Sequence, residues 1–139
     1  MATSTAMYMQ SKVVFSVGGI PVTDIAEGEE IKVTYDRESV SKTLSIEGGG
    51  LFNVRLGKPA RIEVPILQHS RWVSVLSNYK NLHQMVPISL SDMNDYGNTV
   101  TLASAHAMIQ DPEVSFGAEA TSRVFIFDII NLLDVTNPL

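Results

Sequence analysis

Hydrophobic and polar positions alternate along most of this chain, with the period of two that is typical of half-buried β-strands. Ile62, Val64 and Ile66 form one such series. The same rhythm occurs in residues 13–17, 31–35, 43–47, 52–56, 86–90, 99–109 and 122–132. These segments predict a mainly β protein.

Three consecutive glycines, at positions 48–50, separate two of the alternating segments. Glycine adopts turn conformations without steric cost, so the glycines predict the tip of a long β-hairpin over about residues 36–56. Leu44, Ile46, Leu51 and Phe52 flank this tip, where a chain of 139 residues has little material left to cover them. A neighbouring subunit is one way to bury such a surface.

One segment has the period of a helix instead. Apolar residues with i, i+3, i+4 and i+7 spacing predict an amphipathic helix over about residues 70–84, laid on an open face of the sheet. Ser70 suits the N-cap, and Pro87 lies just beyond the far end. The apolar stripe consists of Trp72, Val75, Leu76, Tyr79 and Leu82.

The fold class follows from these elements. We expect an antiparallel β-sandwich or β-barrel with one flanking α-helix and one long hairpin. No repeat, linker or low-complexity tract divides the sequence, so residues 1–139 are expected to form a single domain.

The last alternating segment is unusual because both of its faces are apolar. One face consists of Phe125, Phe127 and Ile129, and the other of Val124, Ile126 and Ile130. A strand of this kind must be covered on both sides. Two interpretations stay open: a central strand between a second sheet and the helix, or a surface buried by a neighbouring subunit.

Composition and charge exclude several classes of protein. The chain has no cysteine and therefore no disulfide, thiolate nucleophile or cysteine-based zinc site. No window approaches about 18 uninterrupted apolar residues, and residues 1–5 lack the features of a signal peptide, so we expect the cytoplasm or a particle assembled there. A net charge of −5 with scattered Lys and Arg argues against a general nucleic-acid binder, although an acidic protein can surround DNA without holding it.

A search for catalytic or metal-binding motifs finds no convincing candidate. The three histidines, at positions 69, 83 and 106, have no partner at metal-ligand spacing, and no Gly-x-Ser-x-Gly elbow is present. Residues 92–97 look like the start of a calcium loop, but Tyr96 and Ala103 occupy positions that need oxygen ligands. We therefore expect no enzymatic activity, no cofactor and no metal.

Five landmarks between Val17 and Leu132 occur in the order found in one known family. They are Gly-Gly-Ile-Pro-Val at 18–22, an acidic entry, strand and charged exit at 27–38, the hairpin at 42–55, a Leu-Gln strand end at 62–68 before the helix, and Asp-Pro-Glu-Val-Ser-Phe-Gly at 111–117 leading to Arg-Val-Phe at 123–125. In this arrangement the chain resembles the small tail tube proteins of contractile-tailed bacteriophages. Pro65 and the triple-glycine tip depart from the family pattern, and Pro65 predicts a strand edge or a bulge.

The resemblance implies a structural subunit of a phage tail. Six copies would close a ring, and stacked rings would form a tube whose lumen conducts DNA during ejection without binding it tightly. The implied partners are further copies of the chain and the tail sheath, baseplate and tail-terminator proteins, and the implied location is the virion tail, assembled in the host cytoplasm.

Two sets of site residues follow from this hypothesis. The predicted inter-subunit contacts, all in the hairpin, are Lys42, Leu44, Ile46, Leu51 and Phe52. The predicted lumen-facing residues, on the polar faces of strands, are Glu30, Lys32, Thr34, Glu47, Asn53, Arg55, Arg61 and Glu63. The second set contains three acids and three bases, so it does not by itself make a channel acidic.

Other functions remain compatible with the sequence. The nearest is the inner tube of a pyocin-like particle or a type VI secretion machine, which sequence does not separate from a phage tail. A second is a monomeric β-barrel module that binds a small ligand or a glycan, although one Trp and four Tyr offer little for an aromatic-lined cavity. A hydrolytic enzyme ranks last because no catalytic constellation was found.

Overall fold

The computed structural model describes residues 13–26, 29–92, 98–111 and 122–138. Its elements, in chain order, are β1 (Val13–Val17), β2 (Ile20–Pro21), β3 (Lys32–Tyr35), β4 (Val40–Leu44), β5 (Gly50–Val54), β6 (Ala60–Leu67), α1 (Arg71–Asn81), β7 (Val86–Asp92), β8 (Asn98–Ile109), β9 (Ser122–Ile129) and β10 (Leu133–Pro138). The expected mainly β fold with one helix is confirmed. Three predicted features include residues outside the described part of the chain: the turn around 93–97, the acidic entry at 27–28 and the Pro-to-Gly portion of the 111–117 landmark.

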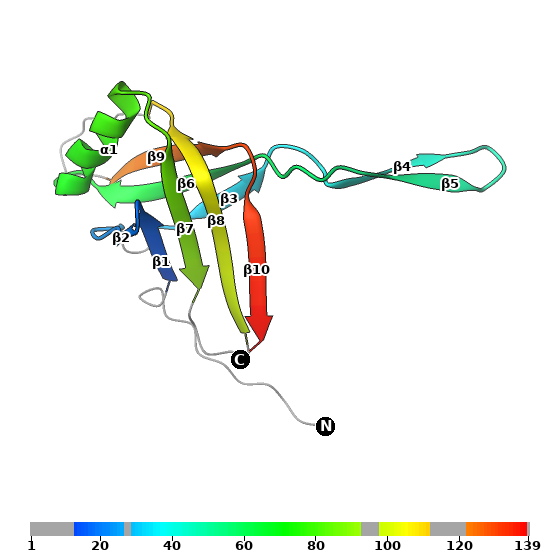
Figure 1. Cartoon of the computed structure of the whole chain (residues 1–139), viewed down its shortest axis with the longest axis horizontal. Coiled ribbons are helices and arrows are strands. Elements are labelled where there is room, and N and C mark those ends of the chain that lie inside the picture. The colour runs from blue at the N-terminus through cyan, green and yellow to red at the C-terminus, as the bar shows by residue number, and fades with distance from the viewer. Residues whose placement is uncertain (1–12, 27–28, 93–97, 112–121, 139) are drawn as a thin grey trace.

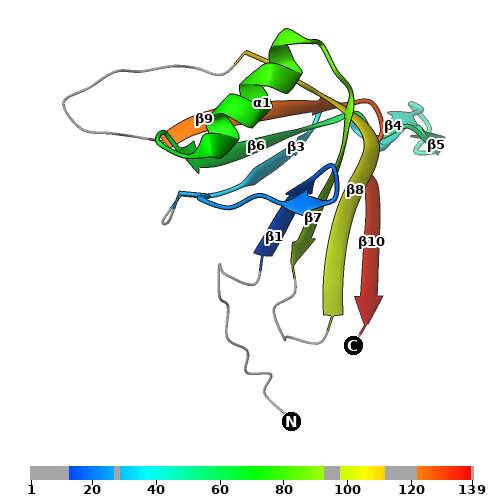
Figure 2. The same ribbon diagram turned by 60° about the vertical axis from the view of Figure 1, so that its left-hand side comes forward.

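One antiparallel sheet accounts for all strands except those of the hairpin. Its order is β2-β1-β7-β8-β9-β6-β3, and β10 pairs with β8. The sheet bends into two layers, one made of β1, β7, β8 and β10 and the other of β9, β6 and β3, with α1 over one end (Figures 1 and 2). We call this part of the molecule the body.

The bend is located in the middle of β8. Ala105 and His106 lie opposite the single residue Pro87, because the register between β7 and β8 shifts there by one residue. Such a bulge kinks and twists the strand. Ser104 stabilises it from inside: the His106 amide donates to Ser104 Oγ at 3.3 Å, and that hydroxyl donates to the His106 carbonyl at 3.1 Å.

The strand that pairs with the other edge of β8 is also interrupted at the bend. The sequence predicted one strand over residues 122–132, but β9 ends at Ile129 and a second strand, β10, begins at Leu133. Both keep one common register against β8, since Ile129 pairs with Ala107 and Leu133 pairs with Ala103. Strand β8 and the segment β9–β10 that pairs with it therefore bend together, and this bend allows one sheet to form both layers.

The core lies between the layers. Phe15 and Phe127 are fully buried and meet edge to face, with ring centroids 5.1 Å apart. The strand with two apolar faces, β9, lies between β8 and β6 in the sheet, which agrees in part with the central-strand interpretation. Its second face is only partly covered, and Ile130, just past its end, is 79% exposed. Burial by a neighbouring subunit stays a prediction.

Helix α1 closes one end of the body. Ser70 is the N-cap, as expected, and its Oγ accepts a hydrogen bond from the Trp72 amide at 3.2 Å. Trp72 and Leu76 are buried, and the indole N–H of Trp72 donates to Thr23 Oγ1 at 3.2 Å. The core is thereby sealed where the two layers separate.

The predicted helical stripe is wrong at two positions. Val75 is 36% exposed, because it lies about 60° around the helix from Trp72, on the side away from the buried Leu76. Leu82 is 72% exposed because the helix ends at Asn81, short of the predicted residue 84. The helix stops in a Schellman arrangement in which His83 has a φ of 51° and the Gln84 amide donates to the Tyr79 carbonyl at 3.1 Å.

Pro65 partly fulfils the expectation for its position. Strand β6 is interior in the sheet order and pairs with β9 without a bulge. However, β3 covers only Ala60–Glu63 of its other side, and the Pro65 carbonyl there accepts from the Ala26 amide at 3.0 Å. The N and C=O groups of a strand residue point to the same side, so the missing N–H faces residues 24–26, which are paired with β6 only through the isolated bridge between Ile25 and Ile66.

Candidate assembly surface

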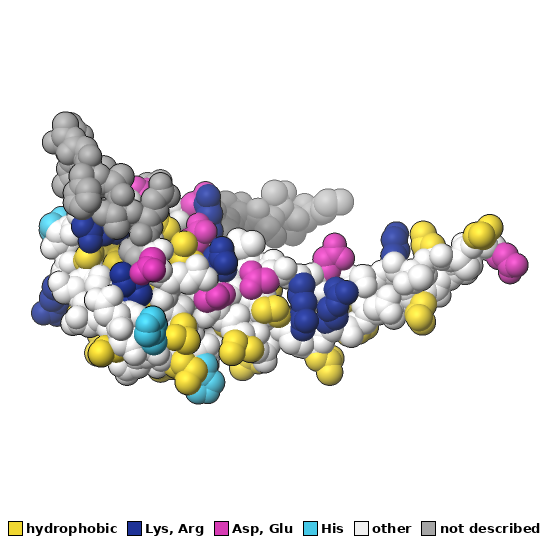
Figure 3. Space-filling model, turned by 90° about the horizontal axis from the view of Figure 1, so that it is seen from above, with side chains coloured by type: hydrophobic (Ala, Val, Ile, Leu, Met, Phe, Trp, Pro, Cys, Tyr) yellow, Lys and Arg dark blue, Asp and Glu magenta, His cyan; other side chains and the backbone are white. Residues whose placement is uncertain are grey.

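The hairpin is a separate two-stranded sheet that projects from the body past β10 (Figure 1). We call residues 36–56 the arm. In β4 and β5, Val40 pairs with Val54, Lys42 with Phe52, and Leu44 with Gly50. The space-filling view shows apolar and charged side chains distributed along this extension (Figure 3).

One face of the arm is apolar and uncovered. Residues that pair across the hairpin share a face, and alternate positions face opposite ways. The apolar face carries Val40, Leu44, Phe52 and Val54, which are 52%, 69%, 73% and 67% exposed, together with Lys42. The opposite face is mostly polar, and there the side-chain Nδ2 of Asn53 donates to Thr43 Oγ1 at 3.2 Å. The arm is thus amphipathic, with a face that lacks a hydrophobic partner in the described chain.

The tip of the arm is a tight turn closed by Ser45. Its hydroxyl donates to the Gly49 carbonyl at 3.0 Å and accepts from the Gly49 amide at 3.0 Å. Gly48 has a φ of 93°, a conformation that a side chain would strain, so the predicted role of glycine in this turn holds for Gly48. Ile46 is fully exposed at the tip.

Backbone and arginine hydrogen bonds cross the neck that joins the arm to the body. The guanidinium of Arg37 donates to the Gly57 carbonyl at 3.3 Å, and that of Arg55 donates to the Glu38 carbonyl at 3.2 Å. Further bonds run from the Arg55 amide to the Ser39 carbonyl and from the Asp36 amide to the Pro59 carbonyl, at 2.8 and 2.9 Å. These bonds hold the two segments of the neck, residues 36–39 and 55–59, side by side and keep the arm extended.

The predicted contact residues all lie on the arm but not on one face. Lys42, Leu44 and Phe52 share the apolar face, Leu51 lies on the opposite face, and Ile46 is at the tip. Sequence reasoning missed Val40 and Val54, although their even spacing from Leu44 and Phe52 was the signal that could have found them.

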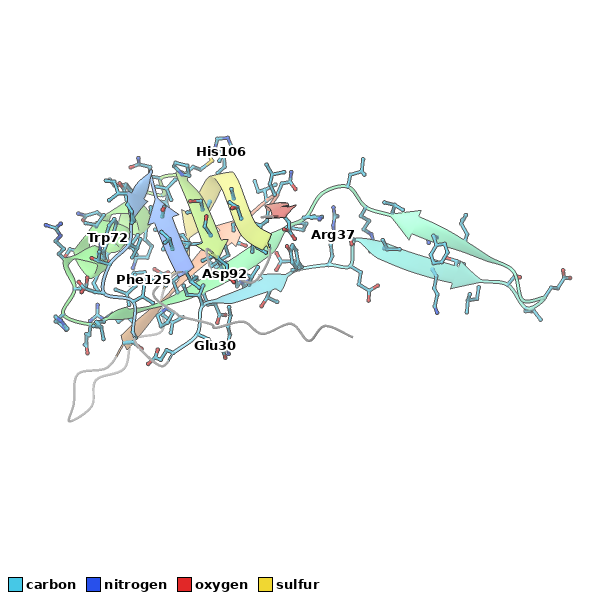
Figure 4. All side chains as sticks on the ribbon, turned by 90° about the horizontal axis from the view of Figure 1, so that it is seen from below. Glu30, Arg37, Trp72, Asp92, His106 and Phe125 are labelled. Atoms are coloured by element: carbon cyan, nitrogen blue, oxygen red, sulfur yellow. The ribbon has the colours of Figure 1, made fainter. Side chains whose placement is uncertain are left out.

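The predicted lumen residues are divided between two places. Glu47, Asn53 and Arg55 belong to the arm. The other five lie on or beside the outer face of β3 and β6, where Lys32 pairs with Glu63 and Thr34 pairs with Arg61. Glu30 forms an exposed ion pair with Lys32 at 3.7 Å, and Figure 4 shows Glu30 on the side of the body opposite His106. The eight residues therefore do not form one continuous wall, and the lumen assignment stays a prediction.

A second outer face escaped sequence reasoning. On the layer of β1, β7, β8 and β10, most outward positions carry small uncharged side chains, namely those of Ser16, Ser89, Ser91, Thr101 and Ala103. Val14 and Leu133 share this face, because Val14 pairs with Ser91 and Leu133 pairs with Ala103. The alternation of the small side chains with apolar residues was visible in the sequence. Their assembly into one face depends on the strand order, which the sequence pattern does not contain.

The described residues offer little for chemistry. Within them, no three His, Asp or Glu side chains lie close enough to hold a metal ion, and no helix has the length and hydrophobicity needed to cross a bilayer. An open pocket beside the end of α1 is lined by Lys80, Asn81, His83, Ile109, Gln110 and Asp111, and Lys80 Nζ lies 3.1 Å from Asp111 Oδ1. Partial burial and the nearby Asp134 carboxylate raise the pKa of Tyr35 above its ordinary value of 10.0.

Comparison of the sequence with protein-family models and with curated proteins finds no match.

Proposed function

We propose that this chain is a structural subunit of a phage-type tail tube, forming stacked rings whose lumen conducts DNA. The observation that carries the proposal is the arm. Four large apolar side chains lie together on one face, each more than half exposed, on an element held away from the body. Soluble monomers rarely expose a concentrated apolar surface, and such a surface marks an interaction site.

The sheet edges support repeated head-to-tail association. Among the described residues, β10 pairs only with β8, and β2 covers β1 only at Ser16 and Val17. The layer order β1-β7-β8-β10 is antiparallel throughout, so β10 of one copy has the correct polarity to pair with β1 of the next. An interface that repeats by rotation closes a ring and removes the exposed edges. The resemblance to phage tail tube proteins suggests six copies, with sheath, baseplate and tail-terminator proteins as further partners in the virion.

The proposed function is not enzymatic and involves no cofactor. A conduit for DNA needs a wall that does not trap phosphate, and the net charge of −5 agrees with that requirement. Electrophoretic shift assays at low and physiological salt should show no complex of unassembled subunits with DNA. Tight binding that weakens steeply with salt would contradict the conduit and favour a nucleic-acid-binding module.

Two outer faces compete for the channel wall: the charged face of β3 and β6, and the uncharged face of β1, β7, β8 and β10. The natural absence of cysteine permits a direct comparison. In assembled tubes, a cysteine at Glu63 or at Ser89 should react slowly with a bulky thiol reagent when it lines the lumen and quickly when it faces outward. Protection of Glu63→Cys alone would favour the predicted lumen residues.

Electron microscopy provides the central test. Purified protein should form rings or tubes in negative stain, and deletion of residues 41–52 should abolish them while circular dichroism shows an unchanged body. Small featureless particles from the full chain would support a monomeric binding module instead. Tubes that persist after the deletion would show that the arm is not the connecting element.

A further inference from the structure

A second group of exposed apolar side chains lies on the outer side of the bend in the body. Met85, Met108, Ile130 and Leu133 are 56%, 39%, 79% and 59% exposed, and we call them the bend patch. Met85 precedes Val86, which pairs with Ala107, so the register places it opposite Met108.

The other two members of the bend patch follow from the β8–β9–β10 register. Ile130 directly follows Ile129, which also pairs with Ala107, and Leu133 pairs with Ala103. Apolar side chains lie beside histidine side chains along the lower edge of the body in the space-filling view (Figure 3).

The fold itself does not require these four residues to be hydrophobic. At the bend, the inward positions are taken by Ile129 and Leu132, which are buried. The bulge turns both Ala105 and His106 outward, between the strands that carry the bend patch. The exposed methionines and aliphatic residues therefore add nothing to the core of their own chain, and an external partner would explain them.

The arm of the same chain is held away from this surface. The hydrogen bonds of the neck keep it extended, and it projects beyond β10 in both ribbon views (Figures 1 and 2). The β10 edge is where the next copy of the chain would pair in a ring. An arm that extends past this edge would lie over the body of that next copy. Each subunit would then have a protruding element and a surface that receives one, which is the arrangement of a head-to-tail contact.

Charge also favours an arm as the occupant of the bend patch. The arm contains three acids (Asp36, Glu38, Glu47) and three bases (Arg37, Lys42, Arg55), so the whole net charge of −5 belongs to the rest of the chain. Two bodies repel each other, whereas a neutral arm approaches a body without that penalty. Lys42 lies in the middle of the apolar face, and Asp128 pairs with Met108 in the β8–β9 register, so a carboxylate lies beside the bend patch. One of its oxygens accepts a hydrogen bond from Gln110 Nε2 at 3.0 Å, and Arg61 pairs with Asp128 from β6, so Lys42 would share this carboxylate with them.

The contact between the arm and the bend patch is small, so we expect assembly to require both this contact and the strand pairing. Five residue pairs make a face about 17 Å long and, across two strands, about 10 Å wide at the usual rise and strand spacing. This area of roughly 170 Å² is small beside the roughly 800 Å² that each partner buries in a standard interface. Each copy in a ring would both donate an arm and receive one, so two weak contacts act together with the strand pairing.

We infer that the apolar face of the arm binds the bend patch of the neighbouring copy, with Lys42 facing Asp128. The inference rests on the proposed ring assembly and identifies the acceptor surface within it. It adds a requirement that edge pairing alone does not make: Met85, Met108, Ile130 and Leu133 must be covered in the assembly.

Disulfide trapping in the otherwise cysteine-free chain tests this contact. The test protein carries Leu44→Cys on the arm and Met108→Cys on the bend patch. The matched control carries Leu44→Cys and Val75→Cys, because Val75 on α1 is 36% exposed and Met108 is 39% exposed. After oxidation of the assembled protein, a non-reducing gel should show a ladder of linked copies for the test pair and single chains for the control pair.

The outcomes separate the inference from the proposed function. Rings or tubes that assemble but yield no ladder for the test pair would overturn the acceptor surface and leave the tail tube proposal standing. Dimers formed by Leu44→Cys alone would overturn it as well, because two arms would then face each other. A wild-type chain that stays monomeric would overturn both.

Charge reversal gives a second readout that needs no oxidation. Lys42→Glu should weaken assembly, measured by sedimentation, and the added change Asp128→Lys should restore it. Lys42 is exposed, so thermal unfolding of the Lys42→Glu monomer should hardly change. Asp128→Lys removes the hydrogen bond from Gln110 and places a second cation opposite Arg61, so thermal unfolding of this single variant is the control for its effect on the monomer. Equal assembly of Lys42→Glu and wild type would overturn the pairing of Lys42 with Asp128.

Discussion

The body and the arm contain similar hydrophobic residues, but only the body buries them. Phe127 in β9 is fully buried between two layers, whereas Phe52 in β5 is 73% exposed on a two-stranded sheet. Both residues belong to strands with the same alternating pattern. The difference arises because the body has a second layer and a helix to close over its apolar face, and the arm has neither.

The comparison shows that hydrophobic burial and strand formation are separable in this chain. The arm is held by its backbone ladder, the Ser45 turn and the arginines of the neck. A lone two-stranded hairpin is marginally stable in water. An apolar face on such an element makes physical sense when a partner completes it, and this reasoning underlies the proposed assembly.

The largest expected difference concerns the two phenylalanines. Phe127→Ala should lower the free energy of unfolding by about 3–5 kcal/mol, because it leaves a cavity beside Phe15. Phe52→Ala should change the stability of the monomer by less than about 0.5 kcal/mol, as surface substitutions do, while impairing tube formation. Urea unfolding and electron microscopy measure the two effects. A strongly destabilised Phe52→Ala monomer would mean that the arm packs on its own body.

A similar contrast exists within helix α1. Trp72→Ala should cost about 3–5 kcal/mol, because it removes a buried ring and its hydrogen bond to Thr23. Val75→Ala, three residues away on the exposed side, should cost less than about 0.5 kcal/mol. A near-neutral Trp72→Ala in urea unfolding would indicate that the helix faces solvent or a partner rather than the core.

Loss of the neck hydrogen bonds should lower the local stability of the arm and leave that of the body unchanged. The double variant Arg37→Ala and Arg55→Ala removes two exposed hydrogen bonds and should cost about 1 kcal/mol of local stability. Hydrogen exchange should accelerate at the amides of Asp36 and Arg55, with the amides of β6 unchanged. Equal acceleration in both regions would mean that arm and body open as one unit.

The body also contains a strained position at the end of α1. His83 adopts a left-handed conformation that costs an L-residue about 1–2 kcal/mol. His83→Gly should therefore raise the unfolding free energy, by about 0.5–1 kcal/mol after the extra entropy of glycine in the unfolded chain. Thermal unfolding measures this, and His83→Ala, which keeps the strain, is the control that should bring no gain.

The smallest expected effect concerns Tyr35, where β3 leads into the arm. Partial burial and the Asp134 carboxylate raise the pKa of this phenol, so the folded state favours its neutral form. The resulting stability is present below pH 10 and is lost as the pH rises through the folded pKa. Asp134→Asn should lower the pKa of Tyr35 in an ultraviolet titration, and an unchanged titration would show that burial alone causes the shift.

The sequence by itself determined the kinds of element and most of their positions. The period-two series predicted most of the strands, the glycines and their apolar flanks predicted the hairpin, and Ser70 and Trp72 predicted the start of the helix and its buried side. The predicted segment 43–47 shares only Thr43 and Leu44 with β4, and β2 and β10 were not predicted. The features that were predicted depend on local backbone preference and on which face of a single element is apolar. Backbone preference and the apolar face of an element both depend on residues that are close in sequence, so sequence patterns predict them well.

Only the tertiary structure determined which apolar faces pack against each other and which stay exposed. The alternation of residues 122–132 placed Ile129 and Ile130 on opposite faces but did not show which face would be covered. Nor did it show that Leu132 would be buried three residues after Ile129, which follows from the bend between β9 and β10. Similarly, the polar series at 30–34, 53–55 and 61–63 looked alike in sequence, but the first and third lie together on the paired strands β3 and β6, whereas the second lies on the arm. Burial depends on what packs opposite a residue, and that is fixed by strand order and register across the whole chain.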